Sequence, residues 1–415
     1  MEKDEAEIPA CSKLVEPVLV LQGSYIVELA IARSLGRYNV PVFLLSRGEK
    51  KPHSSFSKFI QSTLFNPDPL ANEQVFIRSL LNFGEKLKKR YGRRILLFPT
   101  EDSSLLLIAK NFDLIKDYFV ILNDPQEKDI LRFSQKIYFF QNLQNSNCGD
   151  FLPLTLFCSG ENDIEFIKKN ITFPCIIKPS EKDIDFSFYK KYNSKILVME
   201  NEADLEKKLI ELLSENHKLV LQELVNQNPG EEVCWWGYRN KSGESFGITA
   251  REIRKFPQMG GTATFMRTEE IPEIHHHATR ILESINFWGI CEIPFMRDQR
   301  SNKFKVLEFN PKCWLQLSLA TEVGLNLPYL AYLEVYRNEL YKPIIDKRRQ
   351  MKWVRGKDDF IRAVIKEEKG NFLKRSLRWI SQVFGNCVYA IHNFSDLNVT
   401  LHRVLGLPWK LLKKL

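Results

Sequence analysis

A strand–helix–strand unit near the amino terminus limits the possible folds more than any other feature of the sequence. Residues 17–23 (PVLVLQG) and 40–46 (VPVFLLS) are short, continuously apolar runs, and residues 24–38 between them carry apolar side chains at helical spacing. Strands that are apolar on both faces are typical of a parallel sheet covered by helices. The unit therefore predicts an α/β domain built around a parallel sheet.

The same unit recurs further along the chain. Helices predicted at residues 70–90 and 103–117 precede the apolar runs RRILLFPT and YFVIL. This repetition predicts a doubly wound, Rossmann-like domain over residues 13–125. The first strand–helix turn, QGSYIVE, lacks the GxGxxG pattern. We therefore interpret it as a tight turn with Ser24 as the helix N-cap, in preference to a dinucleotide site.

The pattern changes after this domain. Residues 126–225 begin with a helix that carries Lys136, and strands and helices then alternate between polar loops, which predicts a small α+β lobe. Residues 226–340 contain consecutive strands joined by turns such as NKSGE, which predicts a large lobe with an antiparallel sheet. Residues 341–415 are basic, aromatic and helix-rich, and we expect a helical C-terminal extension.

Composition excludes several classes of protein. The net charge of +9 is spread along 415 residues without a recognisable nucleic-acid module, so we expect no nucleic-acid partner. The eight cysteines form no CxxC pair, and several lie in apolar runs, as expected for buried thiols in a reducing compartment. The apolar stretches are too short for a membrane span. We expect a cytoplasmic protein.

Polar residues end three of the apolar strands. Lys178 ends FPCIIK, Gln222 and Glu223 end LVLQE, and Glu308 and Asn310 end the run VLEFN. A nucleoside triphosphate needs cations at its phosphates, a backbone edge for adenine and hard oxygen ligands for magnesium. Two strand residues spaced by two point the same way, so Glu308 and Asn310 together favour a metal site.

The order of these segments resembles the ATP-grasp superfamily, in particular a branch of predicted ATP-dependent carboxylate–amine ligases that includes D-aspartate ligase. The similar segments lie between residues 17 and 340 and include LAIARSLGRYNVPVFLL, FPTEDSSLLLIAKN, REIRKFPQMGGTAT and LATEVGLNLPYLAYLEV. The resemblance implies a two-lobed ATP-grasp fold after the Rossmann-like domain. It also implies that ATP activates a carboxylate as an acyl phosphate, which an amine then attacks to form an amide bond.

The resemblance further assigns roles to individual residues. It implies ATP and Mg²⁺ as cofactors, with Mn²⁺ as an alternative ion, and a small-molecule carboxylate and amine as substrates. The implied roles are phosphate binding by Lys136 and Lys178, an adenine hinge at Gln222, Glu223, Leu224 and Val225, ribose binding by Glu231 or Glu232, charge neutralisation by Arg254 and Lys312, and metal binding by Glu308 and Asn310.

The sequence departs from this family pattern at two positions. Pro294 stands where the family carries its first metal carboxylate, so Glu292, two residues earlier, is the candidate replacement and Asp298 a weaker one. Lys312 stands where the family commonly has arginine, which alone offers a bidentate fork to phosphate. The alternative to an active ligase is therefore an ATP-binding protein of the same fold with weakened chemistry or none. The two substrates and a homo-oligomeric state stay open.

Two further motifs invite a functional interpretation. Three consecutive histidines, residues 275–277, fan out around a helix and cannot chelate one ion, so we interpret them as a solvated helix face. The chain ends in the basic amphipathic segment GLPWKLLKKL, residues 406–415. We interpret this segment as a docked terminal helix, with a peripheral membrane helix as the alternative.

Overall fold

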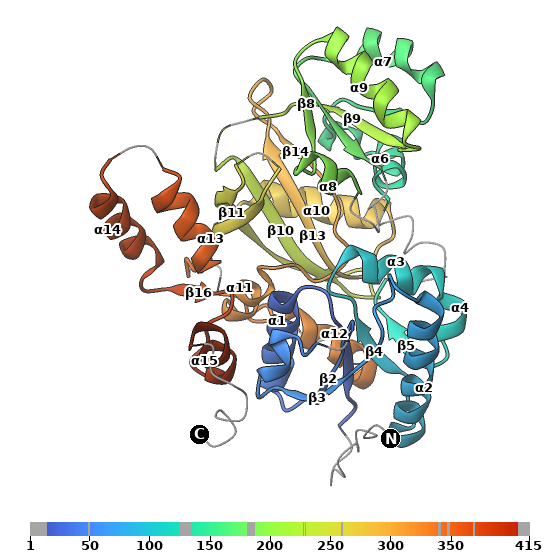
Figure 1. Ribbon diagram of the computed structural model, residues 1–415, viewed down its shortest axis with the longest axis vertical. Helices are drawn as coiled ribbons and strands as arrows, with labels where there is room; N and C mark the ends of the chain where they lie inside the picture. The colour runs from blue at the N-terminus through green and yellow to red at the C-terminus, as the bar shows by residue number, and fades with distance from the viewer. Residues whose placement is uncertain are drawn as a thin grey trace.

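The computed structural model describes residues 15–48, 50–123, 135–180, 187–226, 228, 230–258, 260–338, 342–346, 349–367 and 370–405. Figure 1 shows the amino-terminal domain at the bottom, a small lobe at the top, a large antiparallel sheet between them and the C-terminal extension at the left. The segment 406–415 and most of the residues before Lys136 in the predicted helix lie outside the described residues. Among the residues that the structure describes, no helix is long and apolar enough to cross a membrane.

The amino-terminal domain contains the predicted parallel sheet. Its five strands run in the order β3-β2-β1-β4-β5, and every neighbouring pair is parallel. Most of the strand residues are buried, as their continuously apolar sequences require. The strands are β1 (Val18–Leu21), β2 (Val42–Leu45), β3 (Ile60–Leu64), β4 (Ile95–Phe98) and β5 (Phe119–Ile121), and the helices are α1 (Tyr25–Gly36), α2 (Glu73–Tyr91), α3 (Asp102–Lys110) and α4 (Phe112–Ile115).

Local signals explain where these helices begin and end. The Asn72 side chain accepts a hydrogen bond from the Val75 amide at 3.0 Å and starts α2, and Gly92 ends it with a left-handed φ of 70°. Ser24 occupies the N-cap position of α1, but its side chain makes no capping hydrogen bond. The buried Glu28 carboxylate holds this turn instead, because it accepts a hydrogen bond from the Gly23 amide at 2.9 Å.

The small lobe is a four-stranded antiparallel sheet in the order β6-β9-β7-β8. Two amphipathic helices, α7 and α9, cover one side of this sheet with isoleucine and leucine side chains. The elements of the lobe are α6 (Lys136–Gln144), β6 (Thr155–Cys158), α7 (Ile164–Asn170), β7 (Cys175–Pro179), α8 (Ser187–Tyr192), β8 (Leu197–Met199), α9 (Glu202–Ser214) and β9 (Leu219–Glu223).

The large lobe is a seven-stranded sheet in the order β14-β13-β10-β11-β12-β15-β16. All neighbouring strands are antiparallel except β15 and β16. The strands are β10 (Glu232–Arg239), β11 (Ser245–Phe256), β12 (Thr262–Thr268), β13 (Gly289–Arg297), β14 (Phe304–Val306), β15 (Lys352–Val354) and β16 (Cys387–Tyr389). The helices are α10 (Pro272–Ser284), α11 (Leu317–Glu322) and α12 (Leu327–Arg337).

The C-terminal extension contains the expected helices and also completes the large sheet. Strands β15 and β16 both come from it, and Phe265 of β12 pairs with Val354 of β15. Its helices are α13 (Gly356–Phe360), which continues into a π-helical turn, α14 (Phe372–Val383) and α15 (Leu397–Leu405). The extension is therefore part of the large lobe's architecture.

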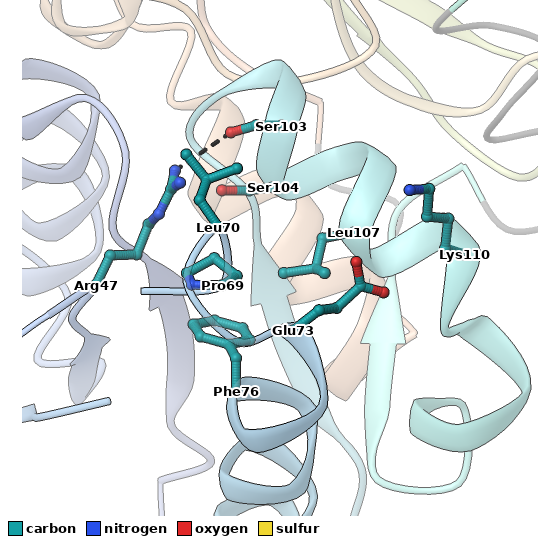
Figure 2. A pocket seen from close by; sticks show the side chains of 9 residues that line it. All are labelled: Arg47, Pro69, Leu70, Glu73, Phe76, Ser103, Ser104, Leu107 and Lys110. Atoms are coloured by element: carbon teal, nitrogen blue, oxygen red, sulfur yellow. Dashed lines mark hydrogen bonds between the residues drawn. The ribbon is translucent and has the colours of Figure 1, made fainter. Parts of the chain in front are cut away.

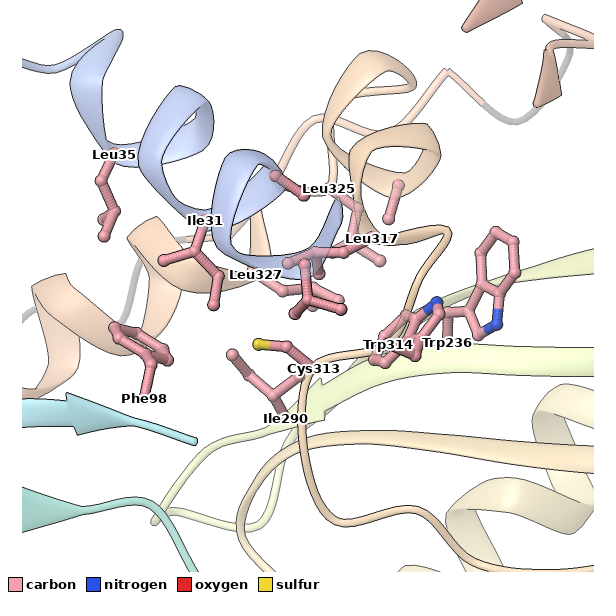
Figure 3. Close-up of a cluster of buried hydrophobic side chains, with 14 of the residues drawn as sticks. Ile31, Leu35, Phe98, Trp236, Ile290, Cys313, Trp314, Leu317, Leu325 and Leu327 are labelled. Atoms are coloured by element: carbon pink, nitrogen blue, oxygen red, sulfur yellow. The ribbon is translucent and has the colours of Figure 1, made fainter. Parts of the chain in front are cut away.

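One apolar cluster joins the amino-terminal domain to the large lobe. Figure 3 shows Ile31 and Leu35 of α1 and Phe98 of β4 beside Leu317, Leu325 and other side chains of the segment that carries α11 and α12. Trp236 and Trp314 extend this cluster along the large sheet, with ring centroids 5.7 Å apart. This packing fixes the carboxyl edge of the parallel sheet against the end of the large lobe.

Candidate nucleotide and metal site

One face of the large sheet gathers the acidic residues of the candidate site. Trp236 of β10 lies opposite Glu292 of β13, and side chains alternate along each strand, so Glu232, Trp236 and Glu292 share a face. Glu252 of β11 joins this face, because Cys234 lies opposite Ala250. The other face is apolar and packs against α10. Three carboxylates on neighbouring strands thus point to the same side of the sheet.

The predicted metal ligands come together on this face. The Asn310 side-chain amide donates hydrogen bonds to Glu308 Oε1 at 2.9 Å and to Glu292 Oε2 at 3.2 Å. The backbones of Glu292 and Asn310 also form a bridge with two hydrogen bonds of 3.0 Å. Glu292, Glu308 and Asn310 therefore surround one point, and we name them the carboxylate cluster.

A bulge shapes the cluster. The Leu307 amide donates a hydrogen bond to the Pro294 carbonyl at 2.8 Å, whereas Asn310 pairs with Glu292. The chain therefore advances by three residues from Leu307 to Asn310, while the partner strand β13 covers the same length with two, from Pro294 to Glu292. A bulge of this kind re-aims the side chains around it. Phe309 points to the opposite side and stacks on Phe139 of α6 at 5.2 Å, which anchors the segment in the apolar core.

Pro294 does not disturb its own strand. The register between β10 and β13 runs without a shift from Glu232 to Arg239, so Glu292 keeps its orientation toward the carboxylate cluster. Proline has no amide hydrogen and cannot donate a hydrogen bond to the Leu307 carbonyl. Lys178 Nζ donates to this carbonyl instead, at 3.3 Å. Asp298 lies apart, where it caps a turn by accepting hydrogen bonds from the Arg300 and Ser301 amides.

Burial raises the pKa of Glu292 to about 7, and the nearby Glu308 carboxylate adds to the shift, while the hydrogen bond from Trp236 Nε1 at 2.9 Å opposes it. Two carboxylates this close repel each other unless a cation or a proton lies between them. Among the described residues, no group of three histidine, cysteine, aspartate or glutamate side chains could hold a metal. A metal site here would therefore combine two carboxylates with the Asn310 amide.

Lys178 connects the small lobe to this cluster. Its Nζ atom donates to Gln222 Oε1 at 2.8 Å, and Gln222 is fixed in turn by Thr155 Oγ1 at 3.0 Å. Burial lowers the pKa of Lys178, and the charges of Glu308 and Glu232 counteract the shift. Lys136, at the start of α6, lies beside the same strand end, because its backbone and side chain contact Ser180 and Pro179.

The residues of the predicted adenine hinge, Gln222 to Val225, make contacts with other parts of the protein. The Glu223 carboxylate accepts a hydrogen bond from the Leu154 amide at 2.8 Å and pairs with Arg300. The Leu224 amide donates to the Pro174 carbonyl at 2.9 Å, and Val225 is buried. The Glu223 amide also donates to the Leu154 carbonyl at 3.1 Å, so the amides of Glu223 and Leu224 both have protein acceptors, and the adenine hinge at Glu223, Leu224 and Val225 stays a prediction.

A lysine that the sequence analysis missed completes the acidic face. Lys255 Nζ lies 2.7 Å from Glu232 and 2.9 Å from Glu252. Burial raises the pKa of Glu252 to about 8, and the neighbouring Glu232 adds to the shift. Irregular register on both sides of Arg254 rotates Lys255 onto this face. In a regular strand Glu252 and Lys255, three residues apart, would point to opposite faces. The sequence therefore carried no signal for their contact, which depends on the bulge.

The two candidates for ribose binding, Glu231 and Glu232, point to opposite faces of the large sheet. Glu232 lies on the face of the carboxylate cluster and is bound by Lys255. Glu231 precedes the strand, where its carbonyl accepts the Arg297 amide at 3.3 Å. By alternation its side chain belongs to the other face. Of the pair, Glu232 thus lies nearer to the other candidate residues.

Arg254 lies in a separate network with the C-terminal extension. Its guanidinium binds both oxygens of the fully buried Asp359, at 2.8 and 2.7 Å, and contacts Gln382 of α14 at 2.6 Å. Thr264 and Trp379 donate to the same carboxylate at 2.9 and 2.8 Å. Each of the three guanidinium nitrogens makes one of these contacts, and the structure does not bring Arg254 into the carboxylate cluster.

Lys312 joins the cluster to the amino-terminal domain. Its Nζ atom lies 2.9 Å from Asp102 at the start of α3. Burial acts to lower the pKa of Lys312, but Asp102, Glu308 and Glu292 together raise it, so the lysine carries a charge. The carboxyl edge of the parallel sheet thus meets the metal-binding candidates directly.

A pocket lies on the amino-terminal domain near this contact (Figure 2). Its lining includes Ser103, Ser104 and Arg47, whose guanidinium contacts Ser103 at 3.2 Å and pairs with Glu101. None of the lining residues belongs to the predicted nucleotide or metal set.

The histidines of α10 differ from the expected solvated face. His276 is exposed, but His275 accepts a hydrogen bond from Trp235 Nε1 at 3.1 Å and His277 packs 4.0 Å from the Phe151 ring. The described cysteines are free, and six of the seven are buried, as expected.

The fold is shared with solved structures of low sequence identity. An N5-carboxyaminoimidazole synthetase from Staphylococcus aureus, complexed with ADP, is 15% identical and matches 77% of this chain and 78% of its own with a TM-score of 0.59. A biotin carboxylase from Campylobacter jejuni matches 78% and 72% at 12% identity (TM-score 0.60), and an L-amino acid ligase from Bacillus licheniformis matches 81% and 77% at 10% identity (TM-score 0.57).

These similarities establish the fold class. No protein-family model matches the sequence, and no curated protein matches it significantly. The matched structures have the ATP-grasp fold, and a parallel five-stranded sheet followed by two mainly antiparallel sheets is typical of this fold. The prediction of an ATP-grasp fold behind a Rossmann-like domain is confirmed.

Proposed function

We propose that this protein is an ATP- and magnesium-dependent ligase that joins a carboxylate to an amine through an acyl phosphate. The observation that carries the proposal is the carboxylate cluster of Glu292, Glu308 and Asn310, within reach of the buried Lys178. Hard oxygen ligands beside cationic side chains are what a magnesium–nucleotide complex requires.

The cluster fits a magnesium ion by the chemistry of its donors. Glu292 and Glu308 supply carboxylate oxygens, and rotation of the Asn310 amide would turn its oxygen toward the point where its nitrogen now bonds both. The raised pKa of Glu292 reflects repulsion and burial that a divalent cation would relieve. When bound, magnesium would neutralise charge on the phosphates of ATP.

The remaining residues would hold the nucleotide. Lys178 and Lys136 would contact its phosphates, and the backbone of Glu223 and Val225 would contact adenine, with Gln222 keeping Lys178 in place. Lys255 is a further cation for phosphate or for the acyl phosphate. We propose Glu232, in preference to Glu231, for the ribose.

The reaction would proceed in two displacements. A carboxylate oxygen of the substrate attacks the γ-phosphorus of ATP, and ADP leaves with the electrons of the broken P–O bond. The amine nitrogen then attacks the acyl carbon, phosphate leaves, and the nitrogen gives up a proton. The buried Lys178 and the partly buried Lys312 would stabilise the charge that develops on the phosphoryl oxygens.

Two observations bear on the substrates. The shared fold with an L-amino acid ligase and the resemblance to the branch of D-aspartate ligase both favour amino acids or their derivatives as carboxylate and amine. We retain a cytoplasmic location as a proposal.

A second candidate is an ATP-binding protein of the same fold that does not complete the reaction. Pro294 favours it, because this position lacks the carboxylate expected from the family pattern. Incubation with magnesium-ATP and pairs of amino acids, with detection of ADP and phosphate, separates the two. ADP formation that requires both substrates supports the ligase, whereas tight ATP binding without ADP formation for any pair supports the second candidate.

A further inference from the structure

Helix α14 carries an apolar stripe that no other described part of the chain covers. Leu373, Leu377 and Ile380 are spaced by four and three positions, so they lie along one side of the helix, and Phe384 follows directly after its last residue. The four side chains are 65%, 58%, 51% and 76% exposed, in that order. Exposed apolar side chains that lie next to one another, with polar residues around them, mark sites of interaction with proteins or membranes. We name these residues the α14 stripe.

The stripe is not the side by which α14 packs on the protein. That side carries Trp379, whose indole bonds to Asp359 at 2.8 Å, and Val383, which is buried against Phe265 and Val354 of the large sheet. At 100° per residue the two sides lie well apart around the helix axis. Figure 1 places α14 at the outer edge of the molecule, away from the amino-terminal domain and the small lobe.

The charged residues of α14 itself are all positive. Lys374 and Arg378 are exposed and follow one flank of the stripe, one turn apart. From residue 370 to residue 395 the sequence contains Lys374, Arg375 and Arg378 and no aspartate or glutamate. An apolar stripe with a basic flank is the arrangement of helices that lie in the interface of a membrane with anionic lipids.

We propose that the α14 stripe docks the protein on an anionic lipid surface. Leucine, isoleucine and phenylalanine side chains would enter the boundary between headgroups and acyl chains, while Lys374 and Arg378 meet the acidic headgroups. Packing of two copies through the stripe is disfavoured, because it would bring the basic flanks of both helices together without an acidic partner on α14.

Co-sedimentation of the full chain with vesicles tests the proposal. The protein should bind phosphatidylcholine vesicles that contain phosphatidylglycerol and bind pure phosphatidylcholine vesicles much less, and added salt should release it. Each buried methylene contributes about fourfold to such binding, so Leu377→Ser with Ile380→Ser should weaken it more than tenfold. Lys374→Gln with Arg378→Gln should weaken it roughly 25-fold, at about fivefold for each basic residue.

The matched control removes two exposed apolar side chains elsewhere. Phe166 on α7 and Ile210 on α9 are 61% and 46% exposed, and Phe166→Ser with Ile210→Ser should leave vesicle binding unchanged. Thermal unfolding checks that each variant is folded. Equal binding to both kinds of vesicle, or equal loss in the control, would overturn the proposal. So would a dimer in light scattering that Leu377→Ser with Ile380→Ser converts to monomer without an effect on vesicles.

Discussion

Replacement of Asp359 by alanine should detach the C-terminal extension from the large sheet. The carboxylate is fully buried and accepts four hydrogen bonds, two from Arg254 and one each from Thr264 and Trp379. Asp359 and Trp379 belong to the extension, whereas Arg254 and Thr264 lie on β11 and β12. The variant would leave a buried guanidinium, an indole and a hydroxyl without their common acceptor.

The magnitude follows from the burial of the pair. Removal of one partner of a buried ion pair costs about 3–5 kcal/mol, because the remaining charge stays desolvated. The Arg254 guanidinium cannot easily move into solvent, because it also stacks on Phe265, with its Cζ atom 4.2 Å from the ring centroid. With a urea dependence of about 1–3 kcal/mol per molar, the first unfolding transition should move down by roughly 1–5 M.

Urea unfolding followed by tryptophan fluorescence measures this shift, because Trp353 and Trp379 lie in the extension. Asp358, the residue before Asp359, is the matched control. Its own carboxylate pairs with Arg355 at 2.6 Å, and its side chain is 35% exposed. Asp358→Ala should cost below about 1 kcal/mol. A similar small shift in both variants would refute the assignment of Arg254 to a structural network.

Three further predictions concern the candidate site. Lys178→Met should raise the Kd for magnesium-ATP about 10- to 100-fold in calorimetry, as expected for one buried charged hydrogen bond, and the exposed Lys207→Met should not. Glu292 has a folded-state pKa of about 7 against an ordinary 4.5, so without magnesium its contribution to stability falls as pH rises from about 4.5 to 7. Glu292→Gln should remove this loss of roughly 3 kcal/mol, measured as thermal stability across pH, and a parallel pH profile in both proteins would contradict the assignment. Pro294→Glu should add a carboxylate on the same face and tighten magnesium binding in calorimetry, at the expense of stability in the metal-free protein; unchanged magnesium affinity would exclude a place for position 294 beside the ion.

Much of the fold was predictable because strong periodic signals dominate it. Residues 17–46 predicted the parallel β1–α1–β2 unit, and the helix expected at 70–90 is α2. The extension was expected to be helical, yet Lys352–Val354 and Cys387–Tyr389 also form strands. Such three-residue strands carry no reliable periodicity, and only pairing with β12 defines them.

The candidate site was predictable where chemistry and strand ends coincide. Lys178, Glu292, Glu308 and Asn310 were all chosen from sequence and lie together. Lys255 was missed in favour of its neighbour Arg254, because a bulge in β11 reverses the side-chain directions that alternation predicts. Long-range contacts such as Lys312 with Asp102 depend on domain packing, which a local pattern cannot specify.

Calorimetric titration of ATP with and without magnesium tests the central claim most directly. We predict that the wild-type protein binds ATP more tightly with magnesium and that Glu308→Gln removes this difference, whereas the exposed Glu283→Gln on α10 retains it. ATP affinity that is independent of magnesium in the wild-type protein, or an unchanged magnesium effect in Glu308→Gln, would contradict the assignment of Glu292, Glu308 and Asn310 as the metal site.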